Sequence, residues 1–107
     1  MASIPSWWAE PVFAFEQLAD EVVAGLPLKL TSWGRTRSRN RAVGGAARSQ
    51  HLVWTAADFA GPKWAKDEAR RRAKRAGLVA LDEGDHLHLQ LYRAGQIPES
   101  VFQAVAV

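Results

Sequence analysis

Apolar residues in the N-terminal part of the chain recur three or four positions apart, which places them on one face of a helix. These residues are Phe15, Leu18, Ala19, Val22 and Leu26. Pro11 suits the first turn of a helix, and Gly25 with Pro27 should end it. The pattern predicts a helix over residues 11–25 that buries one face.

Residues 86–92 instead alternate between polar and apolar side chains, as a half-buried strand requires. The polar face carries His86, His88 and Gln90. Residues 78–81 form another apolar run, and the short connection 82–85 predicts that the two strands make an antiparallel hairpin. Further strands are expected at residues 28–32 and 52–59.

A helix is also expected over residues 63–76, with only small residues on its inner face. They are Ala65, Ala69, Ala73 and Ala76. Small side chains allow close packing, and Gly77 should cap the C-terminal end. With a last short helix at residues 98–106, the elements predict an α+β fold, a small antiparallel sheet flanked by helices. Because there are no repeats and no linker, we expect one domain over residues 1–107.

Residues 35–48 interrupt these patterns with five arginines, Asn40 and the pair Gly44-Gly45, and predict a long loop. Lys and Arg are also dense at residues 63–75, and the formal net charge is +3. An anionic partner fits this charge, but charge alone does not separate nucleic acid from a membrane surface or a cell wall.

The sequence shows no sign of export or membrane insertion. Its first fifteen residues contain no Lys or Arg and are broken by Glu10 and Pro11, so we expect no signal peptide. No apolar run reaches the roughly 18 residues of a membrane span. We expect synthesis as a soluble protein in the cytoplasm.

All three histidines lie in two polar clusters, His51 with Asp58, and His86 and His88 with Asp85. Because the chain has no cysteine, any bound metal must be held by histidine and carboxylate. Asp85 belongs to the opposite strand face by alternation, yet at the turn it can swing round to the histidines. A His-x-His pair on a strand is by itself more often a solvated face than a ligand pair.

Two ligands of one metal at positions 51 and 58 would require the backbone to reverse between them. Seven extended residues cover about 23 Å, whereas zinc ligands lie about 2 Å from the ion. We therefore expect a bend near residues 53–55.

The order of the motifs resembles that of the D-alanyl-D-alanine metallopeptidase family. The matching segments are Thr31-Ser32-Trp33-Gly34-Arg35, Asn40, Val43-Gly44-Gly45, Ser49-x-His51, Ala56-x-Asp58 and Asp85-x-x-His88. The family comprises zinc D,D-carboxypeptidases, D-Ala-D-Ala dipeptidases and L-alanyl-D-glutamate endopeptidases of phage lysins. The resemblance implies a hedgehog-like zinc peptidase fold and one zinc ion per chain.

By position, the resemblance also implies a role for each residue of the site. His51, Asp58 and His88 correspond to the zinc ligands, Asp85 to the general base, and Arg35 to a cleft arginine for a substrate carboxylate or the developing oxyanion. His86 would help to stabilise the tetrahedral intermediate. The substrate-contacting residues would be Ser49, Arg35, Trp54 and Gln90, with Gln90 also suited to supporting a ligand.

The sequence departs from the family signature at two positions. Gly34 stands where the family has Tyr, and Trp54 replaces the glycine of His-x-x-Gly-x-Ala-x-Asp. If that glycine makes the bend, Trp54 must make it with ordinary dihedrals, or the metal geometry changes. A catalytically inactive, wall-binding relative is therefore one alternative, and a nucleic-acid-binding module using residues 35–48 and 63–75 is another.

The resemblance implies a peptide of bacterial peptidoglycan as substrate, cleaved by a monomer without nucleic acid as a partner. The protein would act on the cell wall, phage-encoded or released by lysis. The sequence does not determine which bond is cut or how the protein reaches the wall.

Overall fold

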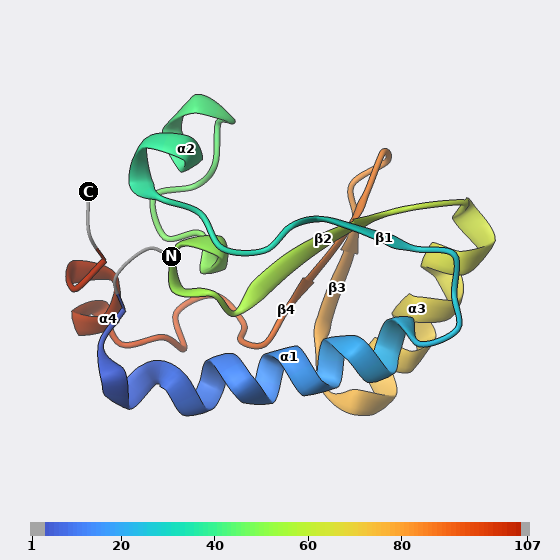
Figure 1. Cartoon of the computed structure of the whole chain (residues 1–107), viewed down its shortest axis with the longest axis horizontal. Helices are drawn as coiled ribbons and strands as arrows, with labels where there is room; N and C mark the ends of the chain where they lie inside the picture. The colour runs from blue at the N-terminus through green and yellow to red at the C-terminus, as the bar shows by residue number, and fades with distance from the viewer. Residues whose placement is uncertain (1–3, 106–107) are drawn as a thin grey trace.

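The computed structural model describes residues 4–105 and contains one antiparallel sheet with helices on both sides (Figure 1). The strands are β1 (Lys29–Ser32), β2 (Ala56–Ala60), β3 (Val79–Asp82) and β4 (Leu87–Gln90), in the order β1-β2-β4-β3. The helices are η1 (Ser6–Trp8), α1 (Ala9–Val23), α2 (Arg37–Ala42), η2 (Gln50–Val53), α3 (Lys63–Ala76) and α4 (Glu99–Gln103). The predicted α+β class is confirmed.

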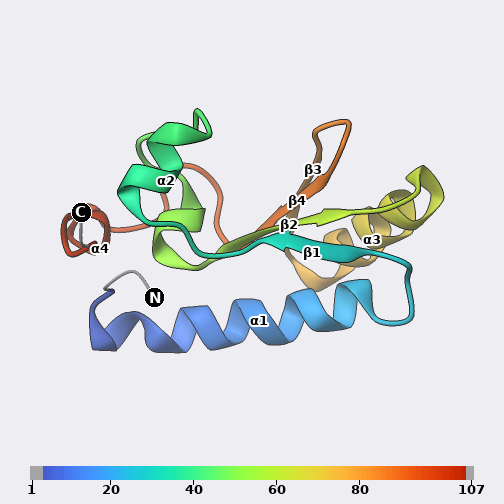
Figure 2. The same cartoon turned by 45° about the horizontal axis from the view of Figure 1, so that its top comes forward.

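Helix α1 runs along one face of the sheet, and α2 lies on the opposite side (Figure 2). The main core joins α1 and α3 to the apolar face of β2 and β4. Phe15 and Val22 of α1 pack there with Leu87 and Leu89 of β4, all fully buried. Because side chains alternate along a strand, this packing directs His86, His88 and Gln90 to the other face, as predicted.

The predicted small face of α3 is confirmed, since Ala65, Ala69 and Ala73 have no exposed surface. Gly77 ends the helix in the left-handed conformation at φ 83°, and its N–H contacts the carbonyls of Ala73 and Lys74. This close packing of α3 helps to hold the sheet face that carries the histidines.

Three predicted boundaries were wrong. Residues 35–48 include α2, whose first turn is capped by Thr36 through a hydrogen bond from the N–H of Arg39. The expected strand at 52–59 is divided into η2 and β2. The last helix covers Glu99–Gln103 rather than residues 98–106, and Ala106 lies outside the described residues.

The expected bend between residues 51 and 58 lies at Trp54. This residue has φ 63° and ψ 25°, so it is left-handed instead of using ordinary dihedrals. η2 and the bend together return His51 to the start of β2. Among residues 4–105, no helix is long and apolar enough to cross a membrane.

Candidate metal centre

A hollow of about 420 Å³ lies over the polar face of β2 and β4. The residues around it that the sequence singled out are Arg35, Ser49, His51, Asp58, His86, His88 and Gln90. Glu83, which the sequence analysis did not select, also lines it. Asp85 and Trp54 do not belong to its lining.

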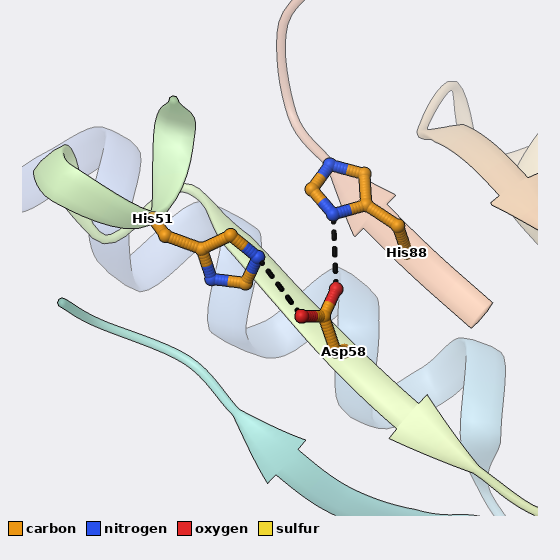
Figure 3. A group of neighbouring side chains, drawn as sticks. All are labelled: His51, Asp58 and His88. Carbon is orange, nitrogen blue, oxygen red and sulfur yellow. Dashed lines mark hydrogen bonds and ion pairs between the residues drawn. The ribbon is translucent and has the colours of Figure 1, made fainter. Parts of the chain in front are cut away.

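Three side chains from separate elements converge at the floor of this hollow (Figure 3). Nε2 of His51 lies 3.2 Å from Oδ2 of Asp58, and Nδ1 of His88 lies 3.0 Å from Oδ1 of the same carboxylate. The antiparallel register places Asp58 of β2 opposite His88 of β4, while η2 supplies His51. All three side chains are at most 12% exposed.

The ring of His51 is oriented by a backbone carbonyl. Its Nδ1 lies 2.5 Å from the oxygen of Trp33, which can only accept a hydrogen bond, so Nδ1 carries the proton. The neutral ring then directs the Nε2 lone pair at Asp58. In keeping with this, Nε2 is buried and has no hydrogen-bond partner among residues 4–105.

The ring of His88 is oriented by Gln90. The amide NH₂ of Gln90 donates to the carbonyl of Tyr92 at 2.6 Å, which leaves Oε1 to face Nε2 of His88 at 2.8 Å. Nε2 of His88 therefore donates, and in the neutral ring the Nδ1 lone pair faces Asp58. Gln90 acts on the metal centre through His88.

Two imidazole lone pairs and one carboxylate thus converge on one point, a donor set that fits a divalent cation. Ligands of a tetrahedral zinc ion lie about 3.4 Å apart, close to the two nitrogen-to-oxygen distances here. Potential ligand atoms of His51, Asp58 and His88 all lie within 4.8 Å of one another. A cation would give the buried Nε2 of His51 the partner that it lacks.

Asp58 and His88 each influence the ionisation of the other. Burial opposes ionisation of Asp58, but the neighbouring imidazoles of His51 and His88 outweigh it and hold the pKa of the carboxyl well below its usual range. Burial likewise opposes protonation of His88, but bonds to Asp58 and Gln90 outweigh it and raise the pKa of the imidazole. Asp58 and His88 thus each favour the charged form of the other, and a cation bound between them would compete with a proton on His88.

Arg35 contacts the carboxylate of Asp58 directly. Its Nη2 donates to Oδ2 of Asp58 at 3.2 Å, and its Nη1 donates to Oδ1 of Asn40 at 3.4 Å. Asn40 is 3% exposed and donates through Nδ2 to the carbonyl of Ala46 at 2.8 Å. A Cβ on Gly45 would overlap this Asn40 amide, so the glycine makes room for the network that orients Arg35.

Asp85 and His86 form a pair at the β3–β4 turn. Oδ1 of Asp85 lies 2.6 Å from Nδ1 of His86, and the side chain of Asp85 is 89% exposed. Asp85 therefore reaches His86, as the turn allows, but it does not line the hollow. His86 instead directs Nε2 into the hollow, 3.7 Å from Asp58 and 3.6 Å from Glu83.

Glu83 is a second carboxylate that lines the hollow beside Asp58, and sequence reasoning missed it. Its Oε1 lies 3.9 Å from Nδ1 of His88, and its N–H donates to the carbonyl of His86 at 2.9 Å, which closes the turn. With Asp58 and His86 it forms a second group of potential ligand atoms within 4.8 Å. The only signal in the sequence was the acidic composition of the turn.

The two departures from the family signature meet in space. The Trp54 indole lies over Gly34, where a Cβ would overlap it, and it packs against Trp33 with ring centroids 5.1 Å apart. Trp54 therefore lies beside the metal centre and does not form the expected wall of the hollow. Ser49 does line the hollow, and its Oγ also accepts the N–H of His51 at 3.3 Å.

The family model described as Peptidase M15 matches residues 8–90, a range that includes every ligand-forming side chain described above. No curated protein and no solved structure matches the chain.

Proposed function

The chain belongs to the peptidase M15 family, and from that premise we propose that it is a zinc-dependent peptidase that hydrolyses a peptide bond in peptidoglycan stem peptides. The observation that carries the proposal is the convergence of His51 Nε2 and His88 Nδ1 on Asp58. The other nitrogen of each ring is held by a hydrogen bond, to the Trp33 carbonyl for His51 and to Gln90 for His88. Metal ligands supported in this way are typical of functional sites.

Zinc is the cation that this donor set favours. Two histidines and one carboxylate hold zinc in many peptidases and leave a coordination position open. When bound there, zinc would polarise the scissile carbonyl and lower the pKa of a coordinated water. The hollow above His51, Asp58 and His88 leaves room for a peptide to approach.

Three further residues would orient the metal ligands or contact the substrate. Arg35 is bonded to Asp58, so we assign it first to orienting that ligand and second to facing substrate charge. Ser49 lines the hollow and is suited to contact the peptide. Gln90 supports His88, since both ends of its amide are already engaged.

Proton transfer needs a carboxylate or imidazole inside the hollow, and two routes fit. Glu83 lies in the hollow itself and can accept a proton there. Asp85, the base implied by the family signature, contacts only His86 and would act through that imidazole. We assign proton transfer to Glu83, with the pair Asp85 and His86 positioned to receive or return a proton at Nε2.

Peptidoglycan as the substrate rests on the family motif and on charge. Bacterial walls are polyanionic, and the net charge of +3 favours encounter with them. The left-handed backbone of Trp54 preserves the bend that glycine would make, so this departure gives no support to an inactive relative.

Metal analysis combined with wall digestion tests the proposal. The purified protein should contain about one zinc ion per chain. It should release new peptide termini from peptidoglycan, identified by mass spectrometry, and a chelator should stop the release. His88→Ala should lose both zinc and activity, whereas Gln103→Ala, on the exposed side of α4, should keep both. Full activity of His88→Ala would refute the metallopeptidase proposal.

A further inference from the structure

A second and larger hollow, of about 690 Å³, lies between α3, the start of β3 and the segment after β4. Its charged lining residues are Lys63, Asp67, Arg70, Arg71, Lys74 and Arg93. Five positive groups and one negative group therefore line this hollow. Their combined formal charge exceeds the net charge of +3 of the whole chain. One of the two Lys/Arg-rich segments of the chain therefore faces this hollow.

Local ion pairs neutralise only part of this charge. Lys63 lies 2.8 Å and Arg70 3.9 Å from Asp67, Arg71 lies 3.4 Å from Glu68, and all three cations are exposed. Within residues 4–105, Lys74 and Arg93 form no ion pair with an acidic side chain. Exposed pairs of this kind are weak, so the hollow keeps a strong positive potential.

A third hollow lies between this basic hollow and the hollow above His51, Asp58 and His88. The third hollow, of about 420 Å³, shares Arg48, Gln50 and Ala94 with the hollow above the metal centre. The same third hollow shares Arg93 with the basic hollow. The three hollows are therefore neighbours on the surface, in an order that leads from the hollow above His88 past Ala94 to the basic hollow beside α3.

We propose that the basic hollow binds a phosphodiester-bearing polymer of the bacterial wall while a peptide of the same wall occupies the metal centre; this inference rests on the proposed function. Guanidinium groups form bidentate hydrogen bonds with phosphate oxygens. Three guanidinium groups line the basic hollow, those of Arg70, Arg71 and Arg93. No aromatic side chain lines the basic hollow, although single-stranded nucleic acids are bound largely by stacking on such rings. The lining therefore favours a phosphate polymer without bases.

The test compares two variants with equal loss of charge. The first carries Arg70→Gln, Lys74→Gln and Arg93→Gln, in the basic hollow. The control carries Lys29→Gln, Arg39→Gln and Arg41→Gln, at exposed positions outside all three hollows. Zinc-loaded proteins are sedimented with purified walls, before and after the phosphodiester polymer is removed with hydrofluoric acid, over a range of salt concentrations.

The first variant should bind intact walls roughly 10-fold more weakly, with a shallower salt dependence. The control should stay within about 2-fold of the original protein, and removal of the polymer should weaken the original protein as much as the first variant. Equal loss in the control, or equal binding to stripped walls, would overturn the proposal. Stronger binding to single-stranded DNA than to walls, sensitive to the same three residues, would overturn it in favour of nucleic acid.

Two readouts separate this inference from the proposed function. Sedimentation measures binding without cleavage, so a protein that cuts no peptide can still show polymer-dependent binding. Zinc content and turnover of a short soluble peptide should be unchanged in the first variant, because none of its three residues lines the hollow above the metal centre.

Discussion

The indole of Trp54 occupies the space that a Cβ atom on Gly34 would need. Trp54 is also the only non-glycine residue with positive φ in the described chain, at the bend that brings His51 to Asp58. The family signature has its aromatic residue at position 34 and its glycine at position 54, so this protein exchanges the two. A side chain at position 34 and the indole of Trp54 would therefore compete for the same space.

The exchange predicts strong coupling between the two positions. Gly34→Ala should destabilise the protein by about 1–3 kcal/mol, because the new methyl group overlaps the indole. In a Trp54→Gly background the same change should cost less than about 0.5 kcal/mol. Urea unfolding of the four proteins in the cycle measures the difference.

The family-like double variant, Gly34→Tyr with Trp54→Gly, should retain the zinc affinity of the original protein. Equal costs of Gly34→Ala in both backgrounds would show that the two positions are independent.

Gly45→Ala should weaken metal binding from a distance. The added Cβ would displace the Asn40 amide, and Arg35 would lose the partner that holds it against Asp58. We expect zinc affinity to fall roughly 10-fold, measured by competition with a chromophoric chelator. Gly44→Ala is an informative comparison: a Cβ there meets no atom within 4 Å, so any loss would come from its backbone at φ 72°.

Gln90→Met should weaken zinc binding by about 10- to 100-fold, because Nε2 of His88 loses its acceptor while the chain length is kept. Gln90→Glu keeps an acceptor and should bind zinc more tightly than Gln90→Met. The same affinity in both variants would mean that Gln90 does not orient His88.

The two carboxylates of the β3–β4 turn should differ in catalysis. Glu83→Gln should lower kcat by roughly 100-fold or more, since it removes the carboxylate inside the hollow. Asp85→Asn should have a smaller effect, because Asp85 reaches the hollow only through His86. Zinc content checks that both variants keep the metal. A larger loss in Asp85→Asn would instead support the assignment that the family signature implies.

Asp82 should make stability depend on pH. A hydrogen bond from the Gly84 N–H and another from Lys66 keep the pKa of this carboxyl below its ordinary value of 3.8. The folded chain thus binds this proton less readily than the unfolded chain does, so the contribution is present above about pH 4 and is lost as the pH falls through the folded pKa. Asp82→Asn should lower Tm at pH 7, and the difference should shrink towards pH 3. A constant difference across that range would exclude a contribution from the charge.

Local pattern was sufficient for much of the fold. The spacing of apolar residues predicted α1 and α3 to within two residues, and alternation predicted the two faces of β4. Helix α2 was missed because five of its six residues are polar, three of them arginines, and only the cap at Thr36 marks it. The strand at 52–59 was overextended because Leu52 and Val53, the η2 residues within that range, are as apolar and buried as strand residues.

The sequence by itself determined which side chains share the polar face of β4, and the order of its motifs indicated the family and the group His51, Asp58 and His88. Only the tertiary structure decided which carboxylate of the hairpin turn enters the hollow, because the direction of a turn side chain depends on backbone geometry and not on spacing. It also decided how Trp54 takes the place of a glycine. That substitution depends on free space over Gly34, and such space exists only when distant segments of the chain are packed together.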